Sequence, residues 1–305
     1  MVNTLIERKN VQDFIEKHTL IILLVPLLVT LCTVLLYPIG YSFLLSLHKW
    51  SFARPFLGKT FVGISQYLKA LTSEPFLVSI VNTLVFAASA VSIQLVLGIV
   101  IALLLHGNFK GRKIFQTILF IPVVLTPVGV GILWKILLST DIGLFPYILS
   151  TIGFPGISLL SNPLLAKLCI IMIDIWTETP FVFIMVLASL ESLPSEPFEA
   201  AYIDGASRRQ IFRYITLPLI KPVIMVVVLI RVMDVLRIFD TIYILTGGGP
   251  GSATESVSTH TMRAMFEWFR TGYSSALSFI ILLIIVIVSL ILTKIFKVEY
   301  LQVSR

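Results

Sequence analysis

Two carboxylates, a hydroxyl and an aromatic ring recur at helical spacing inside an apolar stretch of the sequence. These residues are Asp174, Thr177, Glu178 and Phe181. Their positions i, i+3, i+4 and i+7 share one face of a helix. A charge near the bilayer centre costs about 2.5–3.5 kcal/mol, so charged residues in a membrane face a protein interior or an aqueous path. This face suits a polar, ring-shaped ligand such as a sugar; the alternative is a pair of acids neutralised by a partner helix for packing.

A second run of charges alternates in sign at every third residue. It consists of Arg231, Asp234, Arg237 and Asp240. Side chains at i and i+3 of a helix can pair, which predicts a largely self-neutralised ladder along one helix. A structural ladder near the outer interface is one interpretation, and a transport pathway lined by these charges is the other. The two are compatible, because charges that line a pathway can also orient its polar groups.

The rest of the sequence gives no catalytic or metal-binding pattern. The four histidines have no ligand spacing with one another or with the two cysteines, and no Ser-His-Asp arrangement is readable. We therefore expect no catalytic residue and no metal site in this chain. A membrane enzyme using Asp174 and Glu178 as acid and base is an alternative, but no nucleophile or metal ligand accompanies the two acids.

The amino-acid composition indicates the kind of secondary structure on which these residues lie. Of the 305 residues, 57% are apolar and 13% are charged, whereas soluble domains have about 45–50% apolar and about 25% charged residues. No Asp, Glu, Lys or Arg occurs between Glu74 and Lys110. A soluble domain is therefore excluded, and so is a disordered chain, which has little apolar surface. Because the apolar runs are continuous and do not alternate, we predict an all-α polytopic membrane protein.

A helix crosses the hydrocarbon core with about 20 mostly apolar residues. Six windows are predicted to cross, two of them charged: 19–47, 76–105, 114–134, 168–190, 218–245 and 271–293. The Gly- and Pro-rich window 142–166 predicts an irregular connection with a short interfacial helix. Lys and Arg favour a cytoplasmic N-terminus. We therefore expect a cytoplasmic segment 1–18, a transmembrane domain 19–295 and a cytoplasmic tail 296–305.

The predicted cytoplasmic loop 191–217 carries the signals of two short helices with a sharp bend. Ser195 can cap the first helix, with Pro197 in its first turn, and Gly205 can end it. Ser207 followed by Gln210 is a capping-box start for the second helix. An ordered loop with bulky apolar side chains predicts a docking element for another protein; the alternative is a lid packed on its own membrane domain.

The same loop resembles a known signature. Glu199-Ala200-Ala201, Gly205, Ile215 and Leu217-Pro218 match the spacing of the EAA signature of permease subunits in binding-protein-dependent ABC importers. Further strings resemble the carbohydrate-uptake branch: Ile203 to Ser207, Trp176, Thr179 to Phe181, Phe239-Asp240, and Leu245 to Pro250. The resemblance covers residues 76–295. It is strongest to the first permease subunit of maltose transporters and to its oligosaccharide and glycerol-phosphate relatives.

The resemblance implies a type I ABC importer permease fold with six transmembrane helices and a non-catalytic transport role. Its implied partners are a second permease subunit, an ATPase homodimer and an extracytoplasmic binding protein, in the cell membrane of a bacterium or archaeon. ATP and Mg would be bound by the ATPase, with no cofactor in this chain and no nucleic acid. The implied substrate is a disaccharide, an oligosaccharide, or a related polyol or glycerol-phosphate compound.

The resemblance also implies roles for individual residues. Those implied to couple to the ATPase are Glu199, Ala200, Ala201, Asp204, Gly205, Ile215, Leu217 and Pro218. Sugar contacts carry over to Thr177, Glu178 and Phe181. Contacts from the following span fall near Arg231, near Asp234 or Val235, and near Arg237 or Ile238, because the alignment differs by one residue between the alternatives. The maltose relative has uncharged residues at these last positions, so the resemblance fixes neither the identity of the bound sugar nor direct binding by these residues. An ion-coupled transporter that works alone, with the second charge run as its relay, is a further alternative.

Overall fold

The computed structural model describes residues 21, 24–107 and 109–296. The predicted cytoplasmic segment 1–18, and the predicted tail 296–305 apart from Phe296, lie outside this part of the chain. The described chain is almost entirely helical, which confirms the predicted all-α class.

The first half of the chain, as far as the structure describes it, contains two short strands and a series of helices. They are the π-helical turn Cys32–Leu36, α2 (Tyr37–Ser46), β1 (His48–Lys49), the 3-10 turn Pro55–Leu57, β2 (Thr60–Phe61), α3 (Ser65–Leu71), α4 (Glu74–Leu105), α5 (Arg112–Val124), α6 (Pro127–Leu137) and α7 (Leu144–Thr151). The strands form an antiparallel hairpin in which His48 lies opposite Phe61. Helix α7 confirms the short helix predicted within 142–166.

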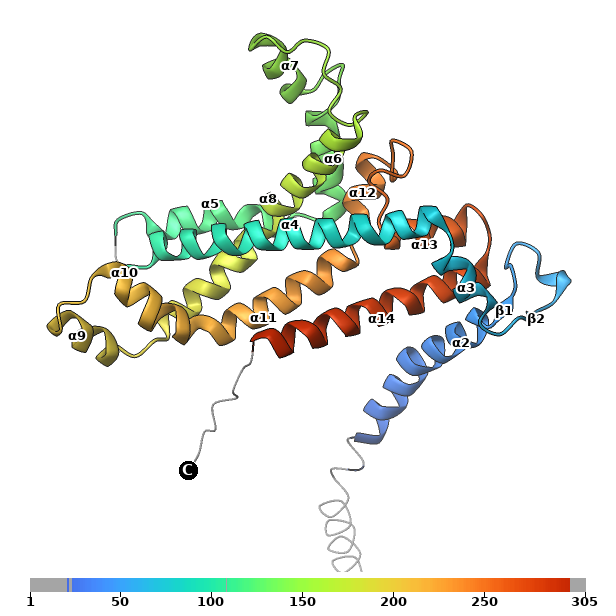
Figure 1. Ribbon diagram of the computed structural model, residues 1–305, viewed down its shortest axis with the longest axis horizontal. Coiled ribbons are helices and arrows are strands. Elements are labelled where there is room, and N and C mark those ends of the chain that lie inside the picture. Colours follow the sequence, from blue (N-terminus) through green and yellow to red (C-terminus); the bar gives the residue numbers. More distant parts are fainter. Residues whose placement is uncertain (1–20, 22–23, 108, 297–305) are drawn as a thin grey trace, which may run out of the picture.

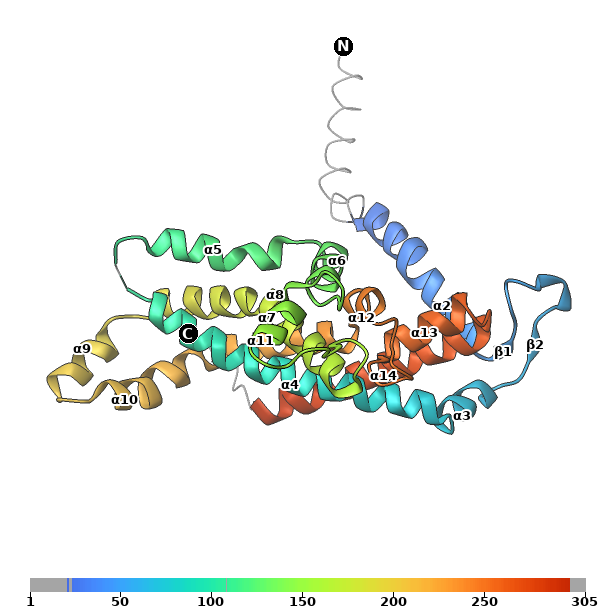
Figure 2. The ribbon, with the colours of Figure 1, turned by 90° about the horizontal axis from the view of Figure 1, so that it is seen from above.

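In the second half up to Phe296, all regular elements are helices. They are α8 (Pro163–Glu191), α9 (Glu196–Ile203), α10 (Arg208–Ile211), the π-helical turn Phe212–Thr216, α11 (Leu217–Leu236), α12 (Asp240–Leu245), α13 (Val257–Phe266) and α14 (Thr271–Phe296). Helices α9 and α10 lie at one end of the molecule, and the β1–β2 hairpin with α3 and α13 lies at the other (Figures 1 and 2).

Four described helices are long and apolar enough to cross a membrane: Leu24–Ser46, α4, α8 and α14. The count becomes five if the bent pair α5 and α6 forms one crossing. Helix α11 has 20 residues, but Lys221, Arg231 and Asp234 make it more charged than these helices. The six predicted crossings thus appear as four long helices, one bent pair and one charged helix, and their number stays a prediction.

The structure shows that the predicted crossing 114–134 is not one continuous helix. Helices α5 and α6 meet at an angle of 95°. Leu125 and Thr126 between them have extended backbones, with ψ of 142° and 141°. Pro127 causes this, because proline disfavours helical geometry at the preceding residue and itself fits the first turn of a new helix. The Thr126 hydroxyl caps α6 by accepting from the Gly129 amide at 3.3 Å.

The core lies where α4 packs along α8 and α11. Phe86, Phe183 and Ile220, one from each helix, are fully buried in it. At the crossing of α4 and α8, a Cβ added to Gly98 would lie 2.5 Å from Val182 Cγ1 and 3.1 Å from the backbone nitrogen of Phe183. Small residues allow such close approach of helices in lipid, where tight packing holds helices together.

We expect Gly98→Ala and Gly40→Ala to change stability in opposite directions. Gly40 lies in α2 with nothing within 4 Å of an added Cβ, so alanine there should stabilise by about 1 kcal/mol through helix propensity. At Gly98 the same methyl group forces α4 and α8 apart, which should cost about 1–3 kcal/mol. Thermal unfolding of the two variants in detergent checks this, and equal shifts of the same sign would contradict the packing.

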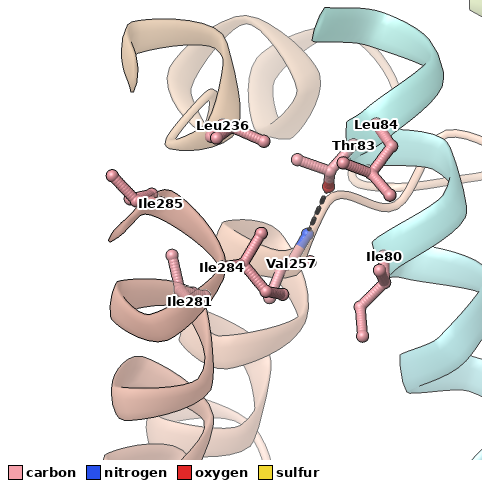
Figure 3. Close-up of a pocket in the computed structure, with 8 residues that line it drawn as sticks. All are labelled: Ile80, Thr83, Leu84, Leu236, Val257, Ile281, Ile284 and Ile285. Carbon is pink, nitrogen blue, oxygen red and sulfur yellow. Dashed lines mark hydrogen bonds between the residues drawn. The ribbon is translucent and has the colours of Figure 1, made fainter. Parts of the chain in front are cut away.

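A small apolar cavity lies between α4, α11, α13 and α14 (Figure 3). Its volume is about 10 Å³, at the lower limit for a single water. Ile80, Leu236 and Ile284 are among its lining residues. Beside it the Thr83 hydroxyl accepts a hydrogen bond from the Val257 amide at 3.0 Å, which ties α13 to α4 (Figure 3). This cavity is part of the packing and is too small for a substrate.

Candidate functional site

A cavity of about 450 Å³ lies beside the bend between α5 and α6, against α8 and the end of α11. Val123, Leu125, Pro127 and Val130 form its apolar side. Its polar side is formed by Asp174, Thr177, Glu178, Arg231, Asp234, Arg237, Asp240 and Thr241. The structure thus brings together every residue predicted for a substrate pathway except Phe181. Phe181 packs against the apolar core, so it does not share the cavity with the rest of its predicted face.

Arg231 lies at the centre of this polar group. Its side chain is only 3% exposed, and it joins α11 to α8. Nη2 is 3.1 Å and 3.3 Å from the two carboxylate oxygens of Asp174, and Nη1 is 3.2 Å from Glu178 Oε2. The acids of α8 are thus paired with a cation from another helix, which agrees with the packing interpretation and leaves them at the cavity wall.

Gln94 of α4 completes the group, and the sequence did not reveal it. The fully buried side chain accepts from Arg231 Nε at 3.1 Å and donates to Asp174 Oδ2 at 2.7 Å. It also donates to the Asp174 backbone oxygen at 3.0 Å. Gln94 therefore orients both partners of the buried ion pair. The available signal was an amide in the middle of an uncharged span, where an unpaired polar group is costly.

The predicted four-residue ladder is wrong in its outer part. Asp234 does lie 3.7 Å from Arg231 Nη1 and 2.9 Å from Arg237 Nη2. Helix α11 ends at Leu236, however, so the i, i+3 spacing does not continue to Asp240. Asp240 begins α12 instead, where an acid is favoured by the helix dipole. Among the described residues no ion pair involves Asp240, and the closest ion pairs of Arg231 are with the acids of α8.

The predicted docking element has the expected local structure. Helix α9 ends before Gly205, whose φ of +71° favours glycine. The capping box of Ser207 and Gln210 is formed at the start of α10. Ser195 precedes α9, but its side chain makes no cap, so only its position was predicted correctly.

This element leaves apolar side chains in the open. Tyr202 and Ile203 at the end of α9 are exposed, Ile203 to 86%, and α9 projects from the end of the helices (Figures 1 and 2). Glu199, Ala200 and Asp204 are exposed as well. Three residues of the predicted coupling set are less accessible: Ala201 is buried, and Ile215 and Leu217 are half-buried. The geometry favours a docking element over a lid packed on its own chain.

A second buried polar cluster, which the sequence did not indicate, joins the segment before α13 to α13 and α4. Glu255 is 1% exposed and lies 3.2 Å from both His260 Nδ1 and Arg263 Nη1. Asn82 of α4 donates to the Glu255 backbone oxygen at 3.1 Å. Burial by itself raises the pKa of the Glu255 carboxyl. The hydrogen bonds from His260 and Ser252 and the charges of His260 and Arg263 outweigh it, so the pKa lies below its usual value.

These features occur in a chain with clear relatives. Residues 94–297 match the family described as binding-protein-dependent transport system inner membrane component. The chain belongs to this family. Two curated relatives of this membrane component are the probable ABC transporter permease protein y4oQ of Sinorhizobium fredii, 38% identical, and the trehalose/maltose transport system permease protein MalF of Thermococcus litoralis, 36% identical. The matches cover 90% and 93% of this chain and 89% and 92% of the relatives.

Solved structures agree with this membership. This membrane component resembles a chain of a bacterial ABC transporter involved in the import of the acidic polysaccharide alginate, with a TM-score of 0.80 and 26% identity. The match covers 94% of this chain and 98% of that chain. A second structure of an alginate transporter, in complex with an alginate pentasaccharide-bound periplasmic protein, has a TM-score of 0.79 and 25% identity, over 93% and 96% of the chains. The permease fold predicted from the signature is thereby confirmed.

We expect the stability of this membrane component to fall at acid pH because of Glu255. A carboxyl with a lowered folded pKa stabilises the fold above its unfolded pKa of about 4.3, and that stabilisation is lost as the pH falls through the folded pKa. Glu255→Gln should therefore lower the melting temperature near neutral pH, and the difference from wild type should shrink below about pH 4. Thermal unfolding in detergent across this range checks it; a difference independent of pH would contradict it.

Proposed function

We propose that this chain is a non-catalytic, membrane-spanning permease subunit of an ATP-driven importer that takes up a carbohydrate. The observation that carries the proposal is the polar cavity between the α5–α6 bend, α8 and α11 in a chain of this family. The relative from Thermococcus litoralis is named for trehalose and maltose transport, and a relative of 31% identity from Mycobacterium tuberculosis is named for trehalose transport. Carboxylates that accept hydrogen bonds from hydroxyl groups are suited to such ligands.

The proposed path for the substrate runs past the cavity. Asp174, Thr177, Glu178, Arg231, Asp234, Arg237 and Asp240 line it, and Phe181 supports it from the core. Because Arg231 connects α8 to α11, it holds the two helices that line the path in a fixed relation. Alternating access then requires these helices to move together or this contact to change.

The proposed partners follow from the separate functions of the subunits in such importers. An extracytoplasmic binding protein delivers the substrate, and a second permease subunit forms the other half of the path. An ATPase homodimer binds ATP and Mg and docks on α9 and α10 through the exposed apolar surface at Tyr202 and Ile203. Among the described residues, no group of three or more His, Cys, Asp or Glu is placed to hold a metal ion.

The proposed orientation places α9 and α10 in the cytoplasm of a bacterial or archaeal cell. The segment 1–18 and the tail 296–305 would lie on the same side, with residues 19–295 forming the membrane domain and 191–217 the coupling loop. The β1–β2 hairpin, at the opposite end from α9 (Figure 1), would then face the binding protein.

Purification from native membranes through an affinity tag on this chain tests the proposal. We expect an ATPase and a second permease to co-purify in fixed stoichiometry. We also expect labelled sugars to bind the binding protein that stimulates ATP hydrolysis by the complex. If the isolated chain moved a sugar down an ion gradient with no ATPase present, the proposal would be wrong and the stand-alone ion-coupled transporter would replace it.

A further inference from the structure

We infer that the cavity beside α8 and α11 selects carbohydrates that are uncharged or positively charged and rejects acidic or phosphorylated ones. The inference rests on the proposed function, because it assumes that the cavity lies on the substrate path. Among the substrates that the resemblance implies, it favours neutral sugars and polyols and excludes glycerol-phosphate compounds.

The first argument is the charge of the cavity wall. Four carboxylates line it, those of Asp174, Glu178, Asp234 and Asp240, against the two guanidinium groups of Arg231 and Arg237. With its acids ionised, the wall has two more negative than positive charges. A cleft lined by one sign of charge concentrates ligands of the opposite sign and repels ligands of the same sign.

The second argument is that the buried cation is already paired with acids of this chain. All three nitrogens of the Arg231 guanidinium have protein partners, namely Gln94 on Nε, Asp174 on Nη2, and Glu178 with the more distant Asp234 on Nη1. The Arg231 side chain is only 3% exposed. A carboxylate or phosphate ligand could therefore bind the fork of this guanidinium only by displacing Asp174 or Glu178.

The third argument concerns Arg237 at the rim. It is 62% exposed, and its Nη2 donates to Asp234 Oδ1 at 2.9 Å while its Nε donates to the Met233 backbone oxygen at 3.1 Å. An exposed guanidinium paired with a carboxylate attracts a third charged group weakly in water. Arg237 therefore does not offset the excess of acids for a ligand inside the cavity.

The acids, in contrast, keep acceptors available. Glu178 uses Oε2 for Arg231, and Asp240 has no ion pair in the described part of the chain. Half-buried carboxylates accept hydrogen bonds strongly from hydroxyl or ammonium groups. The wall is thus built to accept hydrogen bonds from a ligand, which suits sugar hydroxyls and amino groups and does not suit an acidic sugar.

Thiol labelling measures the electrostatic potential inside the cavity, and it does not require the substrate to be known. The intact importer is prepared with Cys32→Ala and Cys169→Ala, which remove the cysteines of the chain. One reporter is then added at a time, Thr177→Cys on α8 or Val123→Cys on α5, both at the cavity wall. Each reporter is reacted with two methanethiosulfonate reagents of similar size, one bearing a trimethylammonium group and one a sulfonate group. Ser150→Cys in α7, within the uncharged segment 142–166, gives the reference rates.

We expect the cation-to-anion rate ratio at both reporters to exceed the reference ratio by about 10-fold or more. The excess should shrink at high salt. It should also shrink when Glu178→Gln or Asp240→Asn is added, while Asp141→Asn, which removes an acid outside the cavity wall, should leave it unchanged. A ratio at or below the reference, or no reaction with either reagent at both reporters, overturns the inference. Carbohydrate uptake is measured separately: normal uptake with a low ratio overturns this inference alone, whereas absence of uptake overturns the proposed function.

Discussion

Replacing Arg231 with methionine should destabilise the permease by about 3–5 kcal/mol, the cost of removing one partner from a buried ion pair. The variant leaves Asp174 and Glu178 at the cavity wall with no cation, and it leaves the Gln94 amide oxygen without its donor. The ion pairs that join α11 to α8 are lost, and Asp234 of α11 then faces these acids without the shared cation, so the contact between the two helices should weaken. We expect a large fall in the melting temperature of the purified complex and loss of uptake.

Arg237→Met is the matched control for this prediction. It makes the same substitution six residues along the chain, at a side chain that is 62% exposed and pairs with one acid, Asp234. Exposed pairs contribute about 0–1 kcal/mol, so the change should be small. Adding Asp174→Asn to Arg231→Met should recover part of the lost stability, because it removes one of the unpaired charges. Equal melting temperatures for Arg231→Met and Arg237→Met would show that the buried cluster does not hold the two helices.

Replacing Gly205 with valine should abolish uptake while the chain remains inserted in the membrane. At φ of +71° a β-branched residue is strained, with a cost of roughly 1–2 kcal/mol, so the bend between α9 and α10 should change. Nothing of this chain lies within 4 Å of a Cβ at this position, and the added side chain would enter the space assigned to the ATPase. ATP-dependent uptake and the amount of co-purified ATPase measure the effect.

Two further variants separate strain from loss of docking. Gly156→Val has the same kind of strain, since Gly156 has φ of +78° and equally open surroundings, but it lies between α7 and α8, away from α9, and uptake should persist. Gly205→Asn keeps the left-handed backbone, which asparagine tolerates, while still adding a side chain. If Asn restores ATPase binding, the backbone bend is what matters; normal uptake by Gly205→Val would contradict the docking role altogether.

The local structure of the loop 191–217 was predictable because its signals lie within a few residues. Gly205 determines the bend between two short helices, and the Ser207 and Gln210 pair forms the second cap through local hydrogen bonds. Pro197 in the first turn of α9 works in the same way. Such features depend on neighbours in the sequence, so the sequence alone predicts them.

The residues of the charged site were predictable from the sequence, but the ion pairs that they form were not. Asp174, Glu178, Arg231 and Asp234 were all found, because charges inside apolar spans are conspicuous. Pairing within α11 was expected, but the closest acidic partners of Arg231 are Asp174 and Glu178 on α8. Helical periodicity relates residues a few positions apart, so it does not predict partners on another helix. Partners across helices depend on how the helices cross, and that depends on close packing such as the contact of Gly98 with Val182.

Two further features lay beyond sequence reasoning for different reasons. Gln94 is uncharged, so nothing in the composition of its span distinguished a buried positioning role from a tolerated polar residue. The length and lack of charge of the window 114–134 do not predict the 95° bend between α5 and α6. Pro127 in the middle of the window is the relevant signal, because proline disfavours helical geometry at the preceding residue.

ATP-dependent uptake into proteoliposomes tests the central claim, that this chain is the permease subunit of an ATP-driven carbohydrate importer. The purified complex is reconstituted with its binding protein and labelled sugar outside, and with ATP and Mg or with Mg alone inside. The account predicts accumulation of sugar only with ATP, lost in Gly205→Val and retained in Gly156→Val. Accumulation driven by an ion gradient without ATP, or by this chain without an ATPase, would contradict it.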